Sequence, residues 1–225
     1  MRGPLAGIGV IELGGGPAIA YAGKLCADLG ADVTRIVSPA DAPDTRTEDD
    51  EASALALYLD ARKKSVAADP TTDAGAAILS ELIAGSRVLF HGSRGLPAPD
   101  VIARKFPNLT VVAVTPFGLT GDARDWPADD LTLQAYGGMS IGIGLPGRPP
   151  LKLPGNQSAF QAGLAAAIAG VAELFTRGGA VVDVSAVDVW ASFYSGVDVA
   201  LAHFKRHAKR RAGHRVAGQP YPRTI

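Results

Sequence analysis

The sequence contains very little cysteine and no excess of charge of either sign. Cys26 is the only cysteine in 225 residues, which excludes a disulfide framework within the chain and a cysteine-rich metal site. The 22 Lys and Arg side chains balance the 22 Asp and Glu side chains, so no overall field favours nucleic acid or an anionic membrane. Partners must therefore be inferred from local sites, and we expect no metal, nucleic acid or membrane among them.

Long hydrophobic runs are also missing. No unbroken apolar stretch is long enough to cross a bilayer, and residues 1–13 do not combine a charged region with a long apolar one, as a secretory signal does. Hydrophobic residues nevertheless make up 47% of the chain, which is enough for one sizeable core. These features predict a folded, soluble and cytoplasmic protein.

Short apolar runs alternate with helical stretches along the chain. Residues 8–13 and 32–37 form β-type runs, separated by a glycine-rich turn and a stretch with helical spacing. The pattern returns with a helix at residues 69–86 and β-type runs at 87–92 and 110–118. Such alternation is typical of βαβ units, whose crossovers build a parallel sheet covered by helices. We therefore predict an α/β fold with a doubly wound, Rossmann-like parallel sheet.

The remaining segments show weaker patterns. Residues 38–53 are acidic and contain proline, which predicts a solvated surface loop. An alanine-rich helix is predicted to begin near Gln157 and to end at Thr176, and a second long helix to run from about Ala186 towards Arg211. The apolar face predicted for the first of these helices contains Phe160, Leu164 and Ile168.

The glycine-rich turn at residues 12–18 matches a dinucleotide-binding turn only in part. Its glycines do not have the spacing G-x-G-x-x-G. The second β-type run ends in Val37 and Ser38, rather than in the acidic residue that would bind a ribose hydroxyl. We interpret these glycines as residues that make a tight turn, and we predict no nicotinamide cofactor.

Two basic segments allow more than one interpretation. Arg62, Lys63 and Lys64 form a cation cluster that suits either a nucleotide phosphate or a solvated basic turn. Residues 203–215 are rich in Lys, Arg and His, as in a DNA-binding arm, but no recognisable motif accompanies them. For this second segment we favour a basic helix end, which complements the negative end of the helix dipole.

The long loop that follows residues 110–115 is the best candidate for a site. Gly118 and Gly121 punctuate it, and it leaves the end of a buried β-type run, where open α/β sheets form their binding sites. Asp129 and Asp130 begin a short helix in this segment and suit an N-cap and the positive end of the helix dipole. We expect this loop to lie at the carboxyl edge of the sheet.

Taken in order, these segments resemble the family III CoA-transferases. The matching stretches are PLAGIGVIELGGG, KLCADLGADVTRIVSP, LDARKKSVAADP, SRVLFHGSRG, VTPFGLTGDARDWPADDLTLQAYGG, PPLKLPGNQSAFQAGLAAAIAG and RGGAVVDVSAVDVWASF, and the most specific part runs from Thr115 to Phe193. The resemblance implies that the chain binds CoA or an acyl-CoA and transfers CoA to a carboxylic acid. The CoA-binding residues that it implies are Lys63, Lys64, Arg94, Gly118, Gly121 and Asp130.

One departure from the family concerns its nucleophile. In the family, an aspartate in an Ala-Asp pair at the start of the central helix carries the acyl group as a mixed anhydride. Ser158 and Ala159 stand at that place here, so the nucleophile position holds a methyl group. The same family also includes racemases, which would need a histidine at position 129 and an acid at position 159, where this chain has Asp129 and Ala159. We therefore assign no catalytic residue, and we expect the Ala159 methyl group to face the CoA pocket.

The resemblance also implies a domain division and partners. Residues 1–190 correspond to the α/β large domain of the family, and residues 191–225 lead towards a small C-terminal domain that we expect to be absent from this chain. Family subunits interlock, so we expect a homo- or hetero-oligomer with a CoA-transferase-like chain. Because Ala159 replaces the nucleophile, the alternative is an inactive subunit or scaffold whose partner supplies the aspartate. Further departures are Asp60 in place of an asparagine and His91-Gly92 in place of a Glu-Asn pair.

Overall fold

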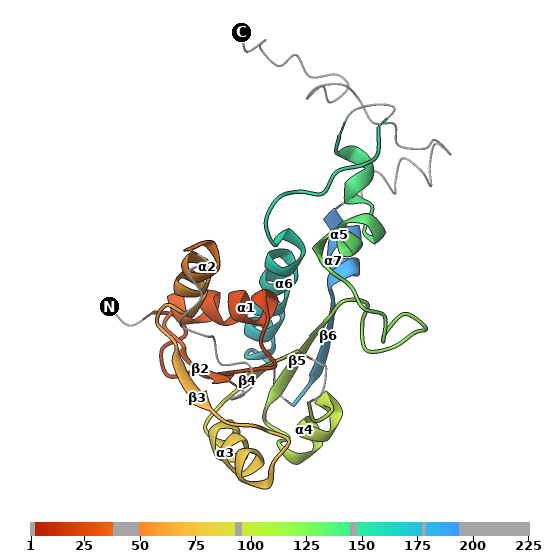
Figure 1. Ribbon diagram of the computed structural model, residues 1–225. Coiled ribbons are helices and arrows are strands. Elements are labelled where there is room, and N and C mark those ends of the chain that lie inside the picture. The colour runs from red at the N-terminus through yellow and green to blue at the C-terminus, as the bar shows by residue number, and fades with distance from the viewer. Residues whose placement is uncertain (1–2, 38–49, 93–95, 145–147, 177–178, 194–225) are drawn as a thin grey trace.

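The computed structural model describes residues 3–37, 50–92, 96–144, 148–176 and 179–193. Its centre is a six-stranded parallel sheet with the strand order β3-β2-β1-β4-β5-β6 (Figure 1). The strands are β1 (Gly9–Leu13), β2 (Asp32–Val37), β3 (Lys64–Ala67), β4 (Val88–Gly92), β5 (Thr110–Thr115) and β6 (Val181–Ser185). The chain begins in the middle of the sheet, moves to one edge, returns to β4 beside β1 and continues to the other edge. The predicted doubly wound, Rossmann-like sheet is therefore confirmed.

Helices cover both faces of this sheet. In Figure 1, α1 and α6 lie on one face with α2 beside them, α3 and α4 lie on the other, and α5 and α7 lie near the ends of β5 and β6. The helices are α1 (Pro17–Asp28), α2 (Asp50–Asp60), α3 (Asp73–Ala84), α4 (Pro99–Lys105), α5 (Asp130–Tyr136), α6 (Gln157–Glu173) and α7 (Ala186–Phe193). A short 3-10 turn, η2 (Met139–Gly142), follows α5.

The core is divided by the sheet into two layers. Alternate side chains of a strand point to opposite faces. Val10, Phe90 and Val112 therefore join the layer beneath α1 and α6, whereas Ile11 and Leu89 join the layer above α3 and α4. Both sets of side chains are almost fully buried. Near-continuous apolar strands of this kind are typical of a parallel sheet with helices on both faces, as the sequence predicted.

Small side chains let α6 approach α1 very closely. A Cβ atom on Gly163 would lie only 2.5 Å from the carbonyl oxygen of Ala18. The buried residues of α6 are Ser158, Ala162, Gly163, Ala166, Ala167 and Gly170. The predicted apolar face of this helix was wrong at two of its three positions, because Ile168 is 62% exposed and Leu164 is 39% exposed, while Phe160 is half-buried. The small residues lie on the buried face because they permit close helix packing, whereas periodicity alone favours the larger side chains.

The structure also changes some predicted boundaries. Residues 50–53 belong to α2, so the predicted surface loop was too long at this end, and residues 38–49 lie outside the described residues. The helix predicted from Gln157 to Thr176 is confirmed as α6, which begins at Gln157 and ends earlier, at Glu173. The second long helix is described as α7, and its expected continuation to Arg211 lies outside the described part of the chain. The division between residues 190 and 191 stays a prediction, and α7 runs across it.

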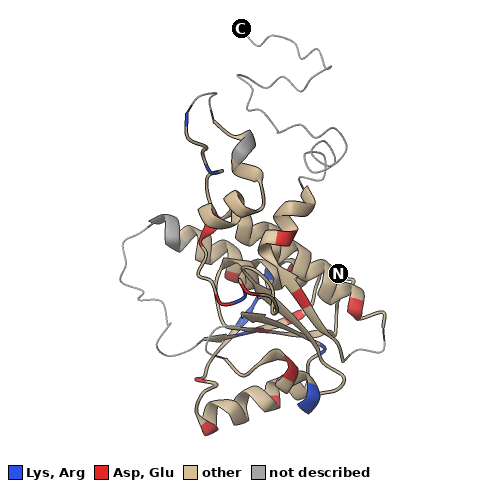
Figure 2. Cartoon of the chain, turned by 90° about the vertical axis from the view of Figure 1, so that its right-hand side faces the viewer, with Lys and Arg blue, Asp and Glu red and all other residues tan. Residues whose placement is uncertain are grey.

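Charged residues are mixed over the molecule. Figure 2 shows acidic and basic positions interspersed around the sheet in this view. Within the described ranges, no helix is both long enough and apolar enough to cross a membrane.

Candidate functional site

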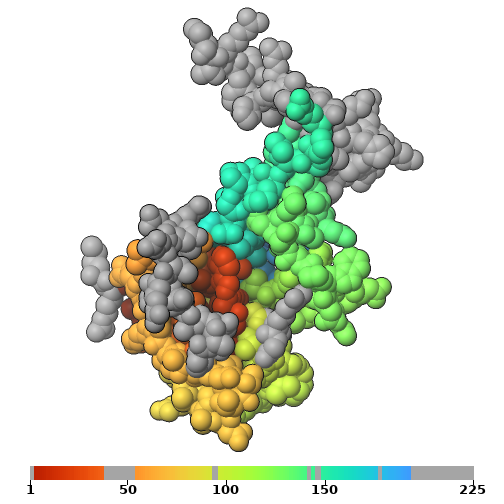
Figure 3. All heavy atoms as spheres, viewed as in Figure 1, coloured from red at the N-terminus to blue at the C-terminus, as the bar shows by residue number. Residues whose placement is uncertain are grey.

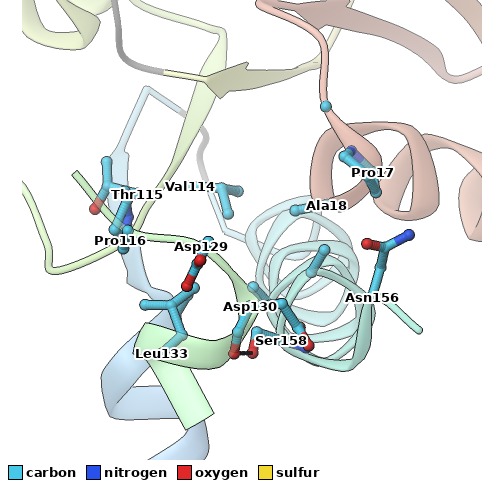
Figure 4. Close-up of a pocket in the computed structure, with 15 residues that line it drawn as sticks. Pro17, Ala18, Val114, Thr115, Pro116, Asp129, Asp130, Leu133, Asn156 and Ser158 are labelled. Atoms are coloured by element: carbon cyan, nitrogen blue, oxygen red, sulfur yellow. Dashed lines mark hydrogen bonds between the residues drawn. The ribbon is translucent and has the colours of Figure 1, made fainter. Parts of the chain in front are cut away.

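A pocket of about 360 Å³ lies at the carboxyl edge of the sheet, and we call it the α1–α6 pocket (Figure 4). Its walls come from the turn before α1, the end of β5, and the first turns of α5 and α6. The lining residues are Gly16, Pro17, Ala18, Val114, Thr115, Pro116, Ala128, Asp129, Asp130, Leu133, Asn156, Ser158, Ala159, Ala162 and Ala186. In Figure 3, red atoms of the N-terminal segment lie directly below the teal atoms and to the left of the green ones. This edge is where ligands bind in doubly wound sheets.

Two helices begin at this pocket without a side-chain cap of their own. The N-cap of α1 is Gly16, which has no side chain, and the N-cap of α6 is Asn156, whose side chain makes no capping hydrogen bond. Among the described residues, the backbone N–H groups of Ala18 and Ala159 have no acceptor. Uncapped N–H groups at the positive end of a helix dipole stabilise an anion or a polarised carbonyl oxygen. The pocket is thus apolar in its walls and polar at two helix ends.

Asp130 fastens the first turn of α6 from outside that helix. Its Oδ1 accepts a hydrogen bond from the backbone N–H of Ser158 at 2.7 Å. Its Oδ2 accepts hydrogen bonds from Gln134 Nε2 at 2.6 Å and from Lys152 Nζ at 3.1 Å. Both carboxylate oxygens are therefore engaged. Asp130 supplies a cap that Asn156 does not, and it ties α5, α6 and the segment before α6 together.

The hydroxyl group of Ser158 is also engaged in hydrogen bonds, one accepted and one donated. Its Oγ accepts a hydrogen bond from Trp190 Nε1 at 2.7 Å and donates one to the backbone oxygen of Asp130 at 3.3 Å. Ser158 is fully buried, and no base contacts its hydroxyl among the described residues. This residue is structural rather than nucleophilic. Sequence reasoning missed Trp190, although a buried indole N–H requires an acceptor.

Asp129 caps the short helix α5, as the sequence predicted. Its Oδ1 accepts hydrogen bonds from the backbone N–H and the hydroxyl of Thr132, both at 2.7 Å. These bonds lower the pKa of Asp129, because they stabilise its ionised form. The side chain is exposed and lines the α1–α6 pocket. An ionised carboxylate therefore faces the pocket.

Ala159 lines the same pocket, in the first turn of α6 next to Ser158. The position where the resemblance places a nucleophile therefore opens into a hollow. The neighbouring Phe160 contacts Tyr21 of α1, with 5.0 Å between ring centroids. This contact, with the close approach at Gly163, holds the start of α6 against α1.

Lys63 does not point into the α1–α6 pocket. Its side chain is 1% exposed, and its Nζ lies 2.5 Å from Glu12 Oε1 and donates a hydrogen bond to the carbonyl oxygen of Ala20 at 2.6 Å. Burial raises the pKa of Glu12 to about 7, although Lys63 partly opposes this shift. The ammonium group of Lys63 is thus enclosed between β1 and α1, and a phosphate would have to compete with Glu12 for it.

The other residues suggested for CoA binding are dispersed. Lys64 lies at the start of β3, exposed, and pairs with Asp32 at 2.7 Å, towards the amino edge of the sheet and away from the pocket. Gly118 is buried in the turn after β5 and donates its N–H to Thr115 Oγ1, while Gly121 is exposed further along this loop. Arg94 lies outside the described residues. Of the residues suggested for CoA binding, Asp130 lines the α1–α6 pocket and the two glycines lie in the loop that continues from its β5 wall.

A second hollow adjoins the first and was not expected. We call this space of about 240 Å³ the α2 hollow, and it shares Gly16 and Pro17 with the α1–α6 pocket. Arg35 lines it at β2, where its guanidinium donates to Asp60 Oδ2 at 2.5 Å. Sequence reasoning missed Arg35, although its place near the carboxyl end of a strand beside the glycine-rich turn was a usable signal.

His91 lies at the end of β4 and is fully buried. Its Nε2 is 2.9 Å from the carbonyl oxygen of Pro97. Burial lowers the pKa of His91, because the charged imidazolium would lose its hydration. His91 is therefore a neutral, hydrogen-bonded residue in the interior of the fold.

Known proteins are similar to this chain in both sequence and fold. A profile of CoA-transferase family III matches residues 5–223. The chain belongs to this family. The succinyl-CoA:(R)-benzylsuccinate CoA-transferase subunit BbsE of Thauera aromatica is 32% identical over 189 residues, which cover 76% of this chain and 46% of the relative. The succinate–glutarate CoA-transferase of Agrobacterium fabrum is 31% identical over 166 residues, with 66% and 41% covered.

Two solved structures are similar to this chain over most of its length. A CAIB/BAIF family protein from Brucella suis gives a TM-score of 0.83 at 26% identity and covers 93% of this chain and 60% of its own. A hypothetical protein from Mycobacterium tuberculosis gives 0.78 at 26% identity, with 91% and 61% covered. The family III large-domain fold is therefore confirmed. The chain spans about half the length of the curated relatives it matches.

Proposed function

We propose that the chain binds a CoA thioester in the α1–α6 pocket and takes part in the transfer of CoA between an acyl-CoA and a carboxylic acid. The observation that carries this proposal is the pocket itself, at the carboxyl edge of a family III sheet, with the backbone N–H groups of Ala18 and Ala159 at two helix ends in its walls. Next to the sulfur atom, the acyl part of a thioester is apolar apart from its carbonyl oxygen. Small apolar walls suit the acyl chain, and the N–H groups of Ala18 and Ala159 suit that oxygen.

The nucleotide end of CoA fits the neighbouring α2 hollow. The two spaces share Gly16 and Pro17, so one extended ligand can lie across both. Arg35 offers a planar fork for phosphate oxygens there, and a phosphate would compete with Asp60 for it. Contacts of CoA with Lys63, Lys64, Arg94, Gly118, Gly121 and Asp130 stay part of this proposal.

Isothermal titration with CoA and with succinyl-CoA tests the binding half. Succinyl-CoA is the first probe because the names of several relatives include succinyl-CoA or succinate. Ala159→Phe should abolish the heat of binding, because the ring fills the pocket. Ala172→Phe places the same ring on an exposed position of α6 and should bind like the unchanged chain. Absence of heat from the unchanged chain at millimolar ligand would remove the proposal.

A non-catalytic subunit is the second candidate function, and Ala159 favours it. The matched relatives include proteins named as a subunit in Thauera aromatica and as alpha and beta subunits in Chloroflexus aurantiacus. In this role the chain completes an assembly whose other chain carries the aspartate. Purified alone, it should exchange no CoA between succinyl-CoA and carboxylic acids, and it should gain stability with a full-length family III chain encoded beside it. Robust exchange by the isolated chain contradicts this role.

A further inference from the structure

The α1–α6 pocket contains one carboxylate that the fold does not fully use. Asp130 lines the pocket, but its two oxygens bind Ser158, Gln134 and Lys152. Asp129 differs, because both hydrogen bonds that hold its side chain fall on Oδ1. Figure 4 shows Asp129 between the end of β5, at Thr115 and Pro116, and Leu133.

We propose that Asp129 Oδ2 is the nucleophile that accepts the acyl group from an acyl-CoA in this chain. The inference rests on the proposed function and assigns the step for which Ala159 provides no reacting atom. Asp129 and Ala159 line the same pocket from different elements, the former at the start of α5 and the latter at the start of α6. A carboxylate thus lines the pocket at Asp129, while Ala159 on α6 offers only a methyl group.

The hydrogen bonds of Asp129 suit a covalent role. Oδ1 stays bound to the N–H and hydroxyl of Thr132, which fixes the carboxylate plane and leaves Oδ2 to attack. Ionisation is maintained by the same two donors, which lower the pKa of the group. No general base is required, because the nucleophile carries no proton to remove.

The acylation step balances without a further reactant. A bond forms between Asp129 Oδ2 and the acyl carbon, and the bond between that carbon and sulfur breaks. The electron pair leaves on sulfur as the CoA thiolate, and the enzyme holds a mixed anhydride. Negative charge that develops on the thioester oxygen can be stabilised by the N–H groups of Ala18 and Ala159, which have no acceptor among the described residues.

Asp129→Asn removes the proposed nucleophile but keeps a side chain that can cap the helix. Asparagine caps a helix as well as aspartate does, so the variant should fold like the unchanged chain. The 225-residue chain is incubated with succinyl-CoA, quenched in acid and weighed intact, and a second sample is treated with hydroxylamine and mapped by peptide mass spectrometry. The unchanged chain should carry an acyl adduct and then a hydroxamate at Asp129. Asp129→Asn should lose both while its affinity for succinyl-CoA stays within about threefold.

Asp122→Asn is the matched control, because Asp122 is an exposed carboxylate of the same loop that does not line the pocket. It should keep the full adduct. An equal adduct in Asp129→Asn, a hydroxamate on another carboxyl group, or no adduct on an unchanged chain that binds succinyl-CoA overturns the assignment. These results differ from a failure of the proposed function, in which the unchanged chain would not bind CoA or succinyl-CoA at all.

Discussion

The two halves of the sheet use their charged side chains in different ways. Around β1, β2 and β3, Glu12 and Lys63 are almost fully buried and meet each other between the strands and α1. Around β5 and β6, Asp130 and Lys152 are paired near the surface. The two hydrogen bonds from Thr132 to Asp129 both fall on Oδ1 and leave Oδ2 outside them. In the first half, this buried pair is enclosed and fixes the fold. In the second half, charged side chains surround a pocket and leave polar atoms for a ligand.

Removal of the buried cation should have the largest effect. Lys63→Met leaves Glu12 in the core without its counter-ion, and the free energy of unfolding at pH 8 should fall by about 4 kcal/mol. Lys64→Met removes an exposed partner of Asp32 and should change the free energy of unfolding by less than about 0.5 kcal/mol. Urea denaturation measures both. Similar losses in the two variants would mean that the Glu12–Lys63 pair does not support the first half of the sheet.

The pH dependence of stability should reveal Glu12. Its pKa is about 7 in the folded protein and has an ordinary value of 4.5, so between these values the folded chain holds a proton that the unfolded chain has released. The contribution of Glu12 to the free energy of unfolding therefore falls by about 3 kcal/mol as pH rises through this window, and then levels off.

Glu12→Gln should remove this slope, whereas Glu81→Gln, at an exposed position of α3, should keep it. The measurement is a series of urea denaturation curves between pH 4.5 and pH 8. The pKa values of Asp69, Asp100 and Asp129 are lowered, so these groups change their charge below this window and do not produce the slope. A slope that persists in Glu12→Gln would show that another group produces it.

Close packing of α1 and α6 connects the two halves and should tolerate little change. A methyl group at Gly163 would meet the backbone oxygen of Ala18, and Gly163→Ala should lower the free energy of unfolding by about 2 kcal/mol. At Gly170 the nearest atom is the side-chain Cγ1 of Val88 at 3.1 Å, and the gain in helix propensity offsets the crowding. Gly170→Ala should therefore be nearly neutral. Thermal denaturation of the pair tests this, and the reverse order of stabilities would contradict the described packing.

A carboxylate at the pocket end of α6 should have the smallest effect on stability. Ala159→Asp should change the free energy of unfolding by less than about 1 kcal/mol, because the helix dipole favours an anion there and the substitution adds no β-branching. Made in the Asp129→Asn background, it should form a hydroxylamine-sensitive adduct with succinyl-CoA, while Ala159→Asn in that background should not. A variant that binds succinyl-CoA without forming the adduct would show that position 159 lies out of reach of the thioester.

Much of the site could be placed from the sequence because its signals are local. Asp129 caps α5 and α6 begins at Gln157, and each of these depends on a few neighbouring residues. The place of Ala159 at a pocket was expected from the family resemblance rather than from a local signal, because the walls come from segments far apart in the sequence. The hydrogen bond from Trp190 to Ser158 joins residues 32 positions apart and had no local signal. Arg35 lines the α2 hollow together with residues of α1 and α2, so its surroundings come from elements distant in the sequence.

The sequence by itself determined the order of strands and helices, and with it the doubly wound sheet and the edge at which its pocket forms. Hydrophobic alternation and right-handed crossovers act over one βαβ unit and leave few other topologies. Only the tertiary structure decided which polar atoms are enclosed. Lys63 and Lys64 are adjacent in the chain, yet one is buried against Glu12 and the other is exposed beside Asp32. Adjacent side chains at a strand start point in opposite directions, and their surroundings come from α1 and β2, elements distant in the sequence.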